Sequence, residues 1–315
     1  MIQFLARRLL SAIPVLFVVS LMTFIIMWLV PGDVSAEIGG ADATPEQIEQ
    51  IREQFGLDRP LIERAIQWYT NLLQGDLGYS YLLDRSVADA VFERLPVTLS
   101  LAALALVLAA VIGTLLGILA AVRHNSSLDQ GSMVAALIGL SIPDFWFGLV
   151  LIILFGVTLG WLPTGGYVPI TEDFFGWVRS MTLPALTLAI TQMGVIARTA
   201  RSSMLDVLDQ DFVRTARAKG MRARTVVFKH ALRNALVPIV TVTGVTAGVL
   251  LSGAVVIEAV FSLPGVGRLI VGSIQRRDFP IIQGGLLVTA SVFVFVNLIV
   301  DMLYGWLDPR VRDGR

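Results

Sequence analysis

Long apolar stretches alternate with polar segments along the chain, and this pattern predicts a membrane protein of six helical spans. A helix needs roughly 20 apolar residues to cross a bilayer core about 30 Å thick. Stretches of about that length occur at residues 9–30, 95–122, 131–158, 180–197, 234–257 and 280–300, and the last can extend to residue 306. Pro143 and Asp144 interrupt the third stretch, and we expect a kink there because proline removes a helical hydrogen bond.

The first stretch follows Arg7 and Arg8, so a cleaved signal peptide is an alternative to a membrane span. Its apolar run is about twice a usual signal-peptide core of roughly 7–15 residues, and no small-residue cleavage pattern closes it. We therefore expect residues 1–30 to form a retained transmembrane helix.

Six spans place both termini on one side of the membrane, and the basic residues indicate which side. Short cytoplasmic loops carry an excess of Lys and Arg. Nine basic residues lie between Arg198 and Arg233, whereas the short loops on the opposite side hold only Arg179, Arg268, Arg276 and Arg277. This asymmetry favours cytoplasmic N- and C-termini in the inner membrane.

Residues 31–95 then form a long external loop, and its capping residues predict helices. Thr44, Pro45 and Gln47 form the pattern of an N-cap, a first-turn proline and a capping-box partner, for a helix that ends at Gly56. A second helix is predicted from Pro60 to Gln74, with one face able to pack, and Ser86 can cap a third.

The remaining composition excludes several classes of function. Of the 315 residues, 55% are hydrophobic and 15% charged, and there is no cysteine, which excludes disulfides and thiol catalysis. The chain has no phosphate-binding loop, no zinc-protease motif and no serine-hydrolase motif, and no basic face suited to nucleic acid. Three Gly-xxx-Gly pairs, which begin at Gly113, Gly156 and Gly244, fit close helix packing.

The most informative polar segment lies between the fourth and fifth spans, at residues 198–234. Asp209 or Asp211 can begin a short helix, Lys219 falls in its last turn, and Gly220 can close it in the left-handed conformation. The small residues Ala216 and Ala218 on this basic helix would let a partner approach closely. The alternative is a basic loop that only orients the protein, but such a connection is usually shorter.

This segment resembles the Glu-Ala-Ala loop of ABC importer permeases. With Gly220 placed on the family glycine, Ala216, Gly220 and Leu232 match, whereas Arg214 and Thr215 replace Glu and Ala, and His230 and Arg233 replace Ile and Pro. The departures resemble the B-type permeases of dipeptide and oligopeptide importers. Further blocks similar to that subfamily lie at residues 31–33, 55–60, 75–78, 261–268, 276–280 and 308–310.

The resemblance implies an all-α, polytopic membrane protein with six transmembrane helices and a type I ABC importer permease fold. The expected organisation is an N-terminal helix (1–30), an external helical loop (31–95), a five-helix type-1 core (96–308) with the coupling loop 198–234, and a cytoplasmic tail (309–315). The residues expected to couple to an ATPase are Arg214, Thr215, Ala216, Arg217, Ala218, Lys219, Gly220 and Met221.

The resemblance also implies the partners: a second permease subunit of a different chain, two cytosolic ATPase subunits and an extracytoplasmic substrate-binding protein. The chain itself would be non-catalytic, without metal or cofactor, because the ATPases bind ATP and magnesium. The cargo would be di- or oligopeptides, with glutathione, nickel chelates or another small solute as alternatives.

Charged residues within predicted spans are costly and often functional. Asp144, Glu258 and Asp301 are therefore candidates for the translocation pathway. The alternatives are an interfacial position for Glu258, an interfacial or paired group for Asp301, and for Asp144 a pair with a neighbouring helix or a place at a local break. Arg198 and Arg201 are expected to anchor the inner membrane surface. Two remoter hypotheses remain: an intramembrane enzyme that pairs Asp144 with Asp301, and a transporter that needs no ATPase.

Overall fold

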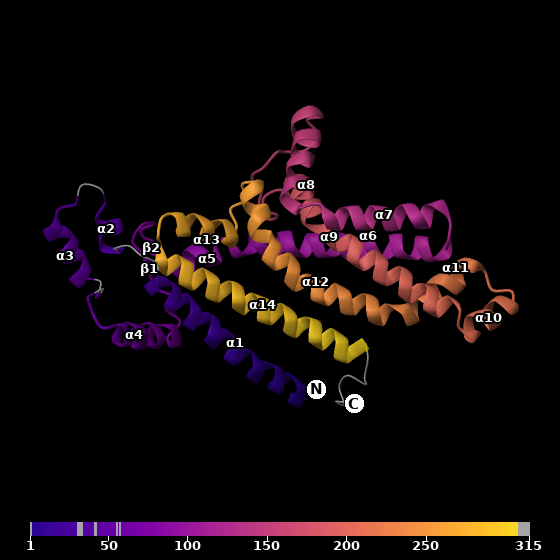
Figure 1. Cartoon of the computed structure of the whole chain (residues 1–315), viewed down its shortest axis with the longest axis horizontal. Helices are drawn as coiled ribbons and strands as arrows, with labels where there is room; N and C mark the ends of the chain where they lie inside the picture. Colours follow the sequence, from indigo (N-terminus) through magenta and orange to yellow (C-terminus); the bar gives the residue numbers. More distant parts are fainter. Residues whose placement is uncertain (1, 30–33, 41–42, 55, 57, 308–315) are drawn as a thin grey trace. The chain divides into compact units, whose positions relative to one another are not determined.

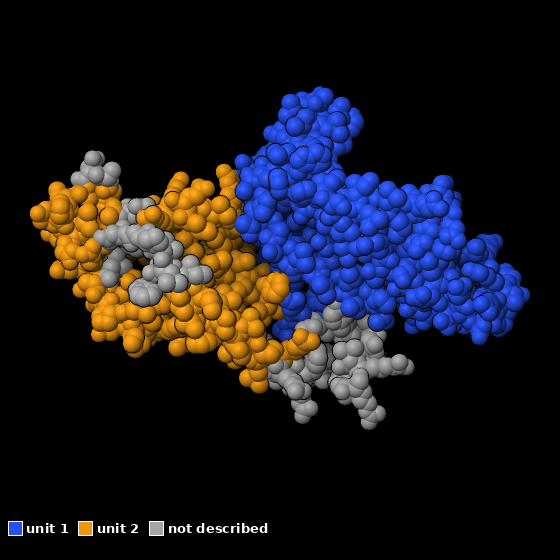
Figure 2. All heavy atoms as spheres, viewed as in Figure 1, with its two compact units in different colours: residues 1–5, 98–263, 295–315 blue, residues 6–97, 264–294 orange. Residues whose placement is uncertain are grey.

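The computed structural model describes the chain apart from residues 1, 30–33, 41–42, 55, 57 and 308–315 (Figure 1). The described residues are mostly helical, and one antiparallel pair of two-residue strands joins β1 (Tyr79–Ser80) to β2 (Arg85–Ser86). They divide into two compact units (Figure 2): residues 1–5, 98–263 and 295–315 form the first, and residues 6–97 and 264–294 form the second.

The helices in chain order are α1 (Ile2–Leu29), α2 (Val34–Gly39), α3 (Pro45–Gln54), α4 (Leu61–Leu73), α5 (Val87–Phe92), α6 (Leu95–Val122), α7 (Ser127–Ser141), α8 (Asp144–Leu151), the π-helix η1 (Ile152–Thr158), α9 (Phe174–Leu208), α10 (Asp211–Ala218), α11 (Ala223–Thr225), the π-helix η2 (Val226–Ala231), α12 (Leu232–Val260), α13 (Val266–Gln275) and α14 (Phe279–Leu307).

Long apolar helices occupy the predicted spans. Four stretches of the described chain are long and apolar enough to cross a membrane: 87–122, 174–208, 223–260 and 279–300. A bent pair, α7 with α8 and η1, forms a fifth candidate, and α1 lies at the remaining predicted position, with an apolar section at Leu10–Ile25. Helices therefore occur at all six positions.

The third predicted span is not a single kinked helix but two helices that meet at a sharp bend. Helices α7 and α8 meet at an angle of 105°. Ile142 is extended (φ −89°, ψ 128°) and Pro143 precedes the first turn of α8 (ψ 132°). The ring of a proline disfavours the helical conformation at the residue before it, so the chain leaves one helix and starts another.

Helix α9 is the centre of the first unit, and its neighbours approach it closely because they present glycine. A Cβ atom on Gly117 of α6 would lie 2.5 Å from the Ala197 carbonyl oxygen of α9, and one on Gly113 would lie 2.9 Å from the Met193 carbonyl oxygen. A Cβ atom on Gly194 of α9 would likewise lie 2.8 Å from the Ala136 carbonyl oxygen of α7. Helix packing in membranes depends on such small residues, because lipid supplies no hydrophobic drive for association.

Of the three predicted glycine pairs, the one on α6 is thus confirmed as a helix contact. Gly156 instead lies beside Thr164 of the loop that follows its own helix, and Gly160 has φ +62° beyond the end of η1. Gly244 and Gly248 are buried on α12.

In the second unit, α5, α13 and α14 enclose an apolar cluster. Its buried members are Val87, Ala90, Val91, Val266, Ile270, Ile281 and Val288. Beside it the Ser80 hydroxyl donates to the Asp278 carboxylate (2.5 Å), although the two residues are 198 positions apart. The contact brings Ser80 and Asp278 together, as expected if the loops that hold them lie on one side of the membrane.

The predicted helices of the 31–95 segment are confirmed. Thr44 and Gln47 exchange the two capping-box hydrogen bonds (3.3 and 2.8 Å) at the start of α3, and the Ser86 hydroxyl accepts from the Asp89 amide at the start of α5. Helix α4 packs on α1 through Trp68 and Tyr69, and the Tyr69 hydroxyl lies 3.1 Å from that of Ser20.

We expect Gly117→Ala to destabilise the protein by about 1–3 kcal/mol, because the added methyl overlaps the backbone of α9. Gly131→Ala is the matched control, since a Cβ at Gly131 meets nothing within 4 Å. Thermal unfolding of both variants in detergent measures the difference. Equal melting temperatures for the two variants would contradict the close approach of α6 to α9.

Candidate functional site

The segment that resembles the coupling loop folds as predicted, into the short helix α10. It runs from Asp211 to Ala218, and Gly220 follows in the left-handed conformation with φ +74°. The Gly220 amide donates to the Arg217 carbonyl (2.9 Å) and the Met221 amide donates to the Ala216 carbonyl (3.3 Å). This pair of bonds is the glycine-dependent Schellman closure of a helix C-terminus.

One face of α10 holds it to the first unit. Val213 and Ala216 are buried together with Val226 of η2, and Val207, Leu208 and Met221 pack around them. Ala216, which we expected to let a partner approach closely, is only 7% exposed and packs in this cluster. The positions of the helix and its C-terminal cap that are exposed include Arg214, Thr215, Arg217, Ala218, Lys219 and Gly220.

A hollow of about 630 Å³ lies beside this helix. Its lining is mainly apolar and comes from the end of α6, the end of α9 and the residues around η2, with His124, Asp209 and Arg217 as polar members. The exposed basic surface of α10 and this hollow are thus adjacent features of one unit.

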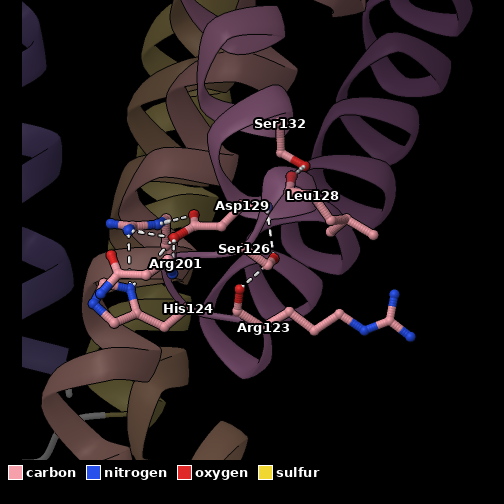
Figure 3. Close-up of polar contacts among 8 residues, drawn as sticks. Arg123, His124, Ser126, Leu128, Asp129, Ser132 and Arg201 are labelled. Atoms are coloured by element: carbon pink, nitrogen blue, oxygen red, sulfur yellow. Dashed lines mark hydrogen bonds and ion pairs between the residues drawn. The ribbon is translucent and has the colours of Figure 1, made fainter.

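An ion pair with a buried carboxylate and a partly exposed guanidinium ties α9 to α7 (Figure 3). The Arg201 guanidinium donates to both carboxylate oxygens of Asp129, at 2.5 and 2.8 Å, and Asp129 is only 2% exposed. The Asn125 amide also donates to Asp129 (3.0 Å), and the His124 Nδ1 atom lies 3.3 Å from the same carboxylate. Arg201 therefore links α9 to α7, a contact that the sequence did not predict.

The charged residues of the predicted spans differ in their exposure and hydrogen bonds. Asp144 is part-buried at the first turn of α8, beside the helix break, and accepts a hydrogen bond from the Thr191 hydroxyl of α9. Glu258 of α12 is completely buried and accepts a hydrogen bond from the Thr98 hydroxyl at 2.5 Å. The side chain of Asp301 lies outside the described residues.

Sequence reasoning did not find the Asp129–Arg201 pair or the burial of Glu258 within the protein. The two members of the pair are 72 residues apart, and no local motif joins them. The usable signal was the presence of one carboxylate and one guanidinium at the same end of neighbouring predicted spans. No group of three or more metal-binding side chains occurs among the residues that the structure covers.

Comparisons with known proteins agree with this architecture. Residues 113–313 match the family described as the binding-protein-dependent transport system inner membrane component, and residues 1–102 match the N-terminal part of such a membrane component. A solved structure, an inward-facing MetNI methionine ABC transporter, superimposes with a TM-score of 0.53 at 19% identity, over 67% of this chain and 93% of that chain. The last comparison supports the type I permease fold.

Three curated relatives cover nearly the whole chain. A putative peptide transport system permease protein of Brucella abortus (strain 2308) is 48% identical over 97% of this chain and 98% of its own length. The di/tripeptide transport system permease protein DppB of Pseudomonas aeruginosa (strain UCBPP-PA14) is 41% identical over the full length of both. The glutathione transport system permease protein GsiC of Escherichia coli (strain K12) is 43% identical over 99% of both.

The helical fold and these matches define a multi-span permease of the inner membrane. The chain belongs to the family of binding-protein-dependent transport system inner membrane components.

We expect Asp129→Ala to lower the free energy of unfolding by about 1–3 kcal/mol, because it leaves the partly buried Arg201 guanidinium without its carboxylate partner. Asp211→Ala is the control: that carboxylate is 96% exposed in its pair with Arg214, and such pairs contribute about 0–1 kcal/mol. Chemical denaturation in detergent measures both changes. A loss for Asp129→Ala no larger than that for Asp211→Ala would show that the pair does not hold α7 to α9.

Proposed function

We infer that this chain is one permease subunit of an ATP-driven importer that carries di- or oligopeptides across the cytoplasmic membrane. The relatives named above support the peptide cargo, and one of them supports glutathione, itself a small peptide, as the second candidate. Two cytosolic ATPase subunits would bind ATP and magnesium, a second permease chain would complete the pathway, and an extracytoplasmic binding protein would deliver the cargo.

The observation that carries this inference is the two-faced structure of α10. Its apolar face is fixed to the end of α9 and to η2, which leads directly into α12. Its exposed face bears Arg214, Arg217 and Lys219. A partner that binds the exposed face and moves would therefore act on the two longest helices of the first unit at once, without separate contacts to either.

The basic loop also supports the orientation. With nine basic residues at 198–233 on the cytoplasmic side, the N- and C-termini are cytoplasmic and the segment 31–95 is extracytoplasmic. The part-buried Asp144 beside the helix break stays a candidate for the translocation pathway. Glu258 would reach that pathway only in a conformation that exposes it, because it has no accessible surface here.

Gly220→Leu tests the coupling role. A side chain at φ +74° disfavours the closure of α10 by about 1–2 kcal/mol, so we expect normal membrane insertion but loss of both peptide uptake and copurification of the ATPases. Gly75→Leu is the matched control, since Gly75 has φ +83° after α4 and an equally open surrounding. Unimpaired uptake by the Gly220 variant would refute the coupling role.

The orientation can be tested with single cysteines, because the chain has none of its own. A membrane-impermeant maleimide added to intact spheroplasts should label Asp58→Cys and leave Arg214→Cys unlabelled until the membrane is opened. Both side chains are exposed, so accessibility to the reagent depends on the side of the membrane. The reverse labelling pattern would invert the proposed topology.

A further inference from the structure

Helix α4 has a wider apolar face than its contact with α1 covers. Trp68 and Tyr69 pack on α1, but three aliphatic side chains of the same helix stay uncovered. Ile62, Ile66 and Leu73 are 71%, 62% and 89% exposed. At about 100° per residue the three lie within about 40° of one another around the helix, so they form a single stripe. Contiguous exposed apolar surface of this kind marks a site that a further surface covers.

The remaining side of α4 is polar. Glu63, Gln67 and Thr70 are exposed there, and the Gln67 side chain accepts a hydrogen bond from the Arg59 guanidinium at 3.4 Å. Helix α4 is therefore amphipathic, with aromatic and aliphatic residues on one side. Helices of this composition lie at membrane surfaces, with the apolar side buried among the lipids and the polar side in water.

The contact with α1 shows how deep α4 reaches. The Tyr69 hydroxyl lies 3.1 Å from that of Ser20, and the Tyr69 ring stacks on Phe17 with their centroids 6.1 Å apart (Figure 1). Ser20 precedes the outer end of the predicted span, at residue 30, by about 15 Å of helix at about 1.5 Å per residue. Because the apolar core of a bilayer is about 30 Å thick, this contact lies within its outer half.

The surroundings at this depth are lipid. On α1 itself, Val18 and Met22 are half-exposed close to the contact, as the outward side chains of a membrane span are. The Trp68 and Tyr69 rings contact each other with their centroids 4.9 Å apart, and such rings are enriched where a membrane meets water. A water-soluble partner stays outside the apolar core, so acyl chains are the surface that matches the stripe on α4.

We propose that Ile62, Ile66 and Leu73 insert among the acyl chains of the outer leaflet and anchor α4 in the membrane. This inference goes beyond the importer function and rests only on α1 being a membrane span. The segment 31–95 is then attached to the lipid through α4, while its capped helix α3 lies before the anchor in the chain. A part of the chain that the hydrophobic pattern assigns to an external loop thus belongs to the membrane.

The test uses single cysteines, because the chain has none of its own. Ile62→Cys, Ile66→Cys and Leu73→Cys are each labelled with a bimane fluorophore in the full complex, after any cysteines of the partner subunits have been replaced. The complexes are placed in nanodiscs of phosphatidylethanolamine and phosphatidylglycerol, with or without bromine on the acyl chains. We expect the three labels to lose most of their fluorescence to the brominated lipid and little to iodide in the water.

Gln67→Cys is the matched control on the polar side of the same helix, and its label should be quenched by iodide and not by brominated lipid. Val18→Cys on α1 is the lipid-facing reference and should respond as the stripe does. Iodide quenching of the stripe equal to that at Gln67 would overturn the proposal. Labels on the stripe that neither agent quenches would show that protein covers it, such as the second permease chain, and would overturn it too. A Val18 label that brominated lipid does not quench would remove the membrane span on which the proposal is built.

Discussion

The close approach of neighbouring helices to α9 is the constraint on which the first unit depends. Lipid offers no hydrophobic drive for two apolar helices to associate, so their contact relies on packing and on a few polar bonds. Gly113 and Gly117 of α6 admit the α9 backbone, and Gly194 of α9 admits that of α7. The same helix carries Arg201, which binds Asp129, and its end supports α10.

The position of α10 depends on this helix, because its buried face packs against the end of α9. Helix α10 is too short to be stable alone, since isolated helices below about 12–15 residues are marginal. Its shape instead depends on the Gly220 closure and on the cluster around Val213 and Ala216. The exposed charges of α10 therefore lie on a short helix that packs on the end of α9. The chain continues from this helix through η2 into α12.

Features that depend on neighbours in sequence were predictable, and features that depend on distant packing were not. The spans, the capping box at Thr44 and the left-handed Gly220 follow from local hydrophobicity and backbone sterics. Ala216 is buried because η2 packs against it, and the sequence of α10 alone does not show where η2 lies. Likewise the sequence around Pro143 predicts a break but not its angle of 105°, because the angle depends on what α7 and α8 pack against. The burial of Glu258 and the role assigned to Asp129 depend on other helices in the same way.

The central claim is that this chain moves peptides only as part of an ATP-driven assembly. The most direct measurement is uptake of a labelled dipeptide into proteoliposomes that contain this chain, with and without the second permease, the ATPases, the binding protein and ATP. The account predicts accumulation only when all components are present and ATP is on the side of the ATPases. Accumulation by this chain alone, without ATP, would contradict it.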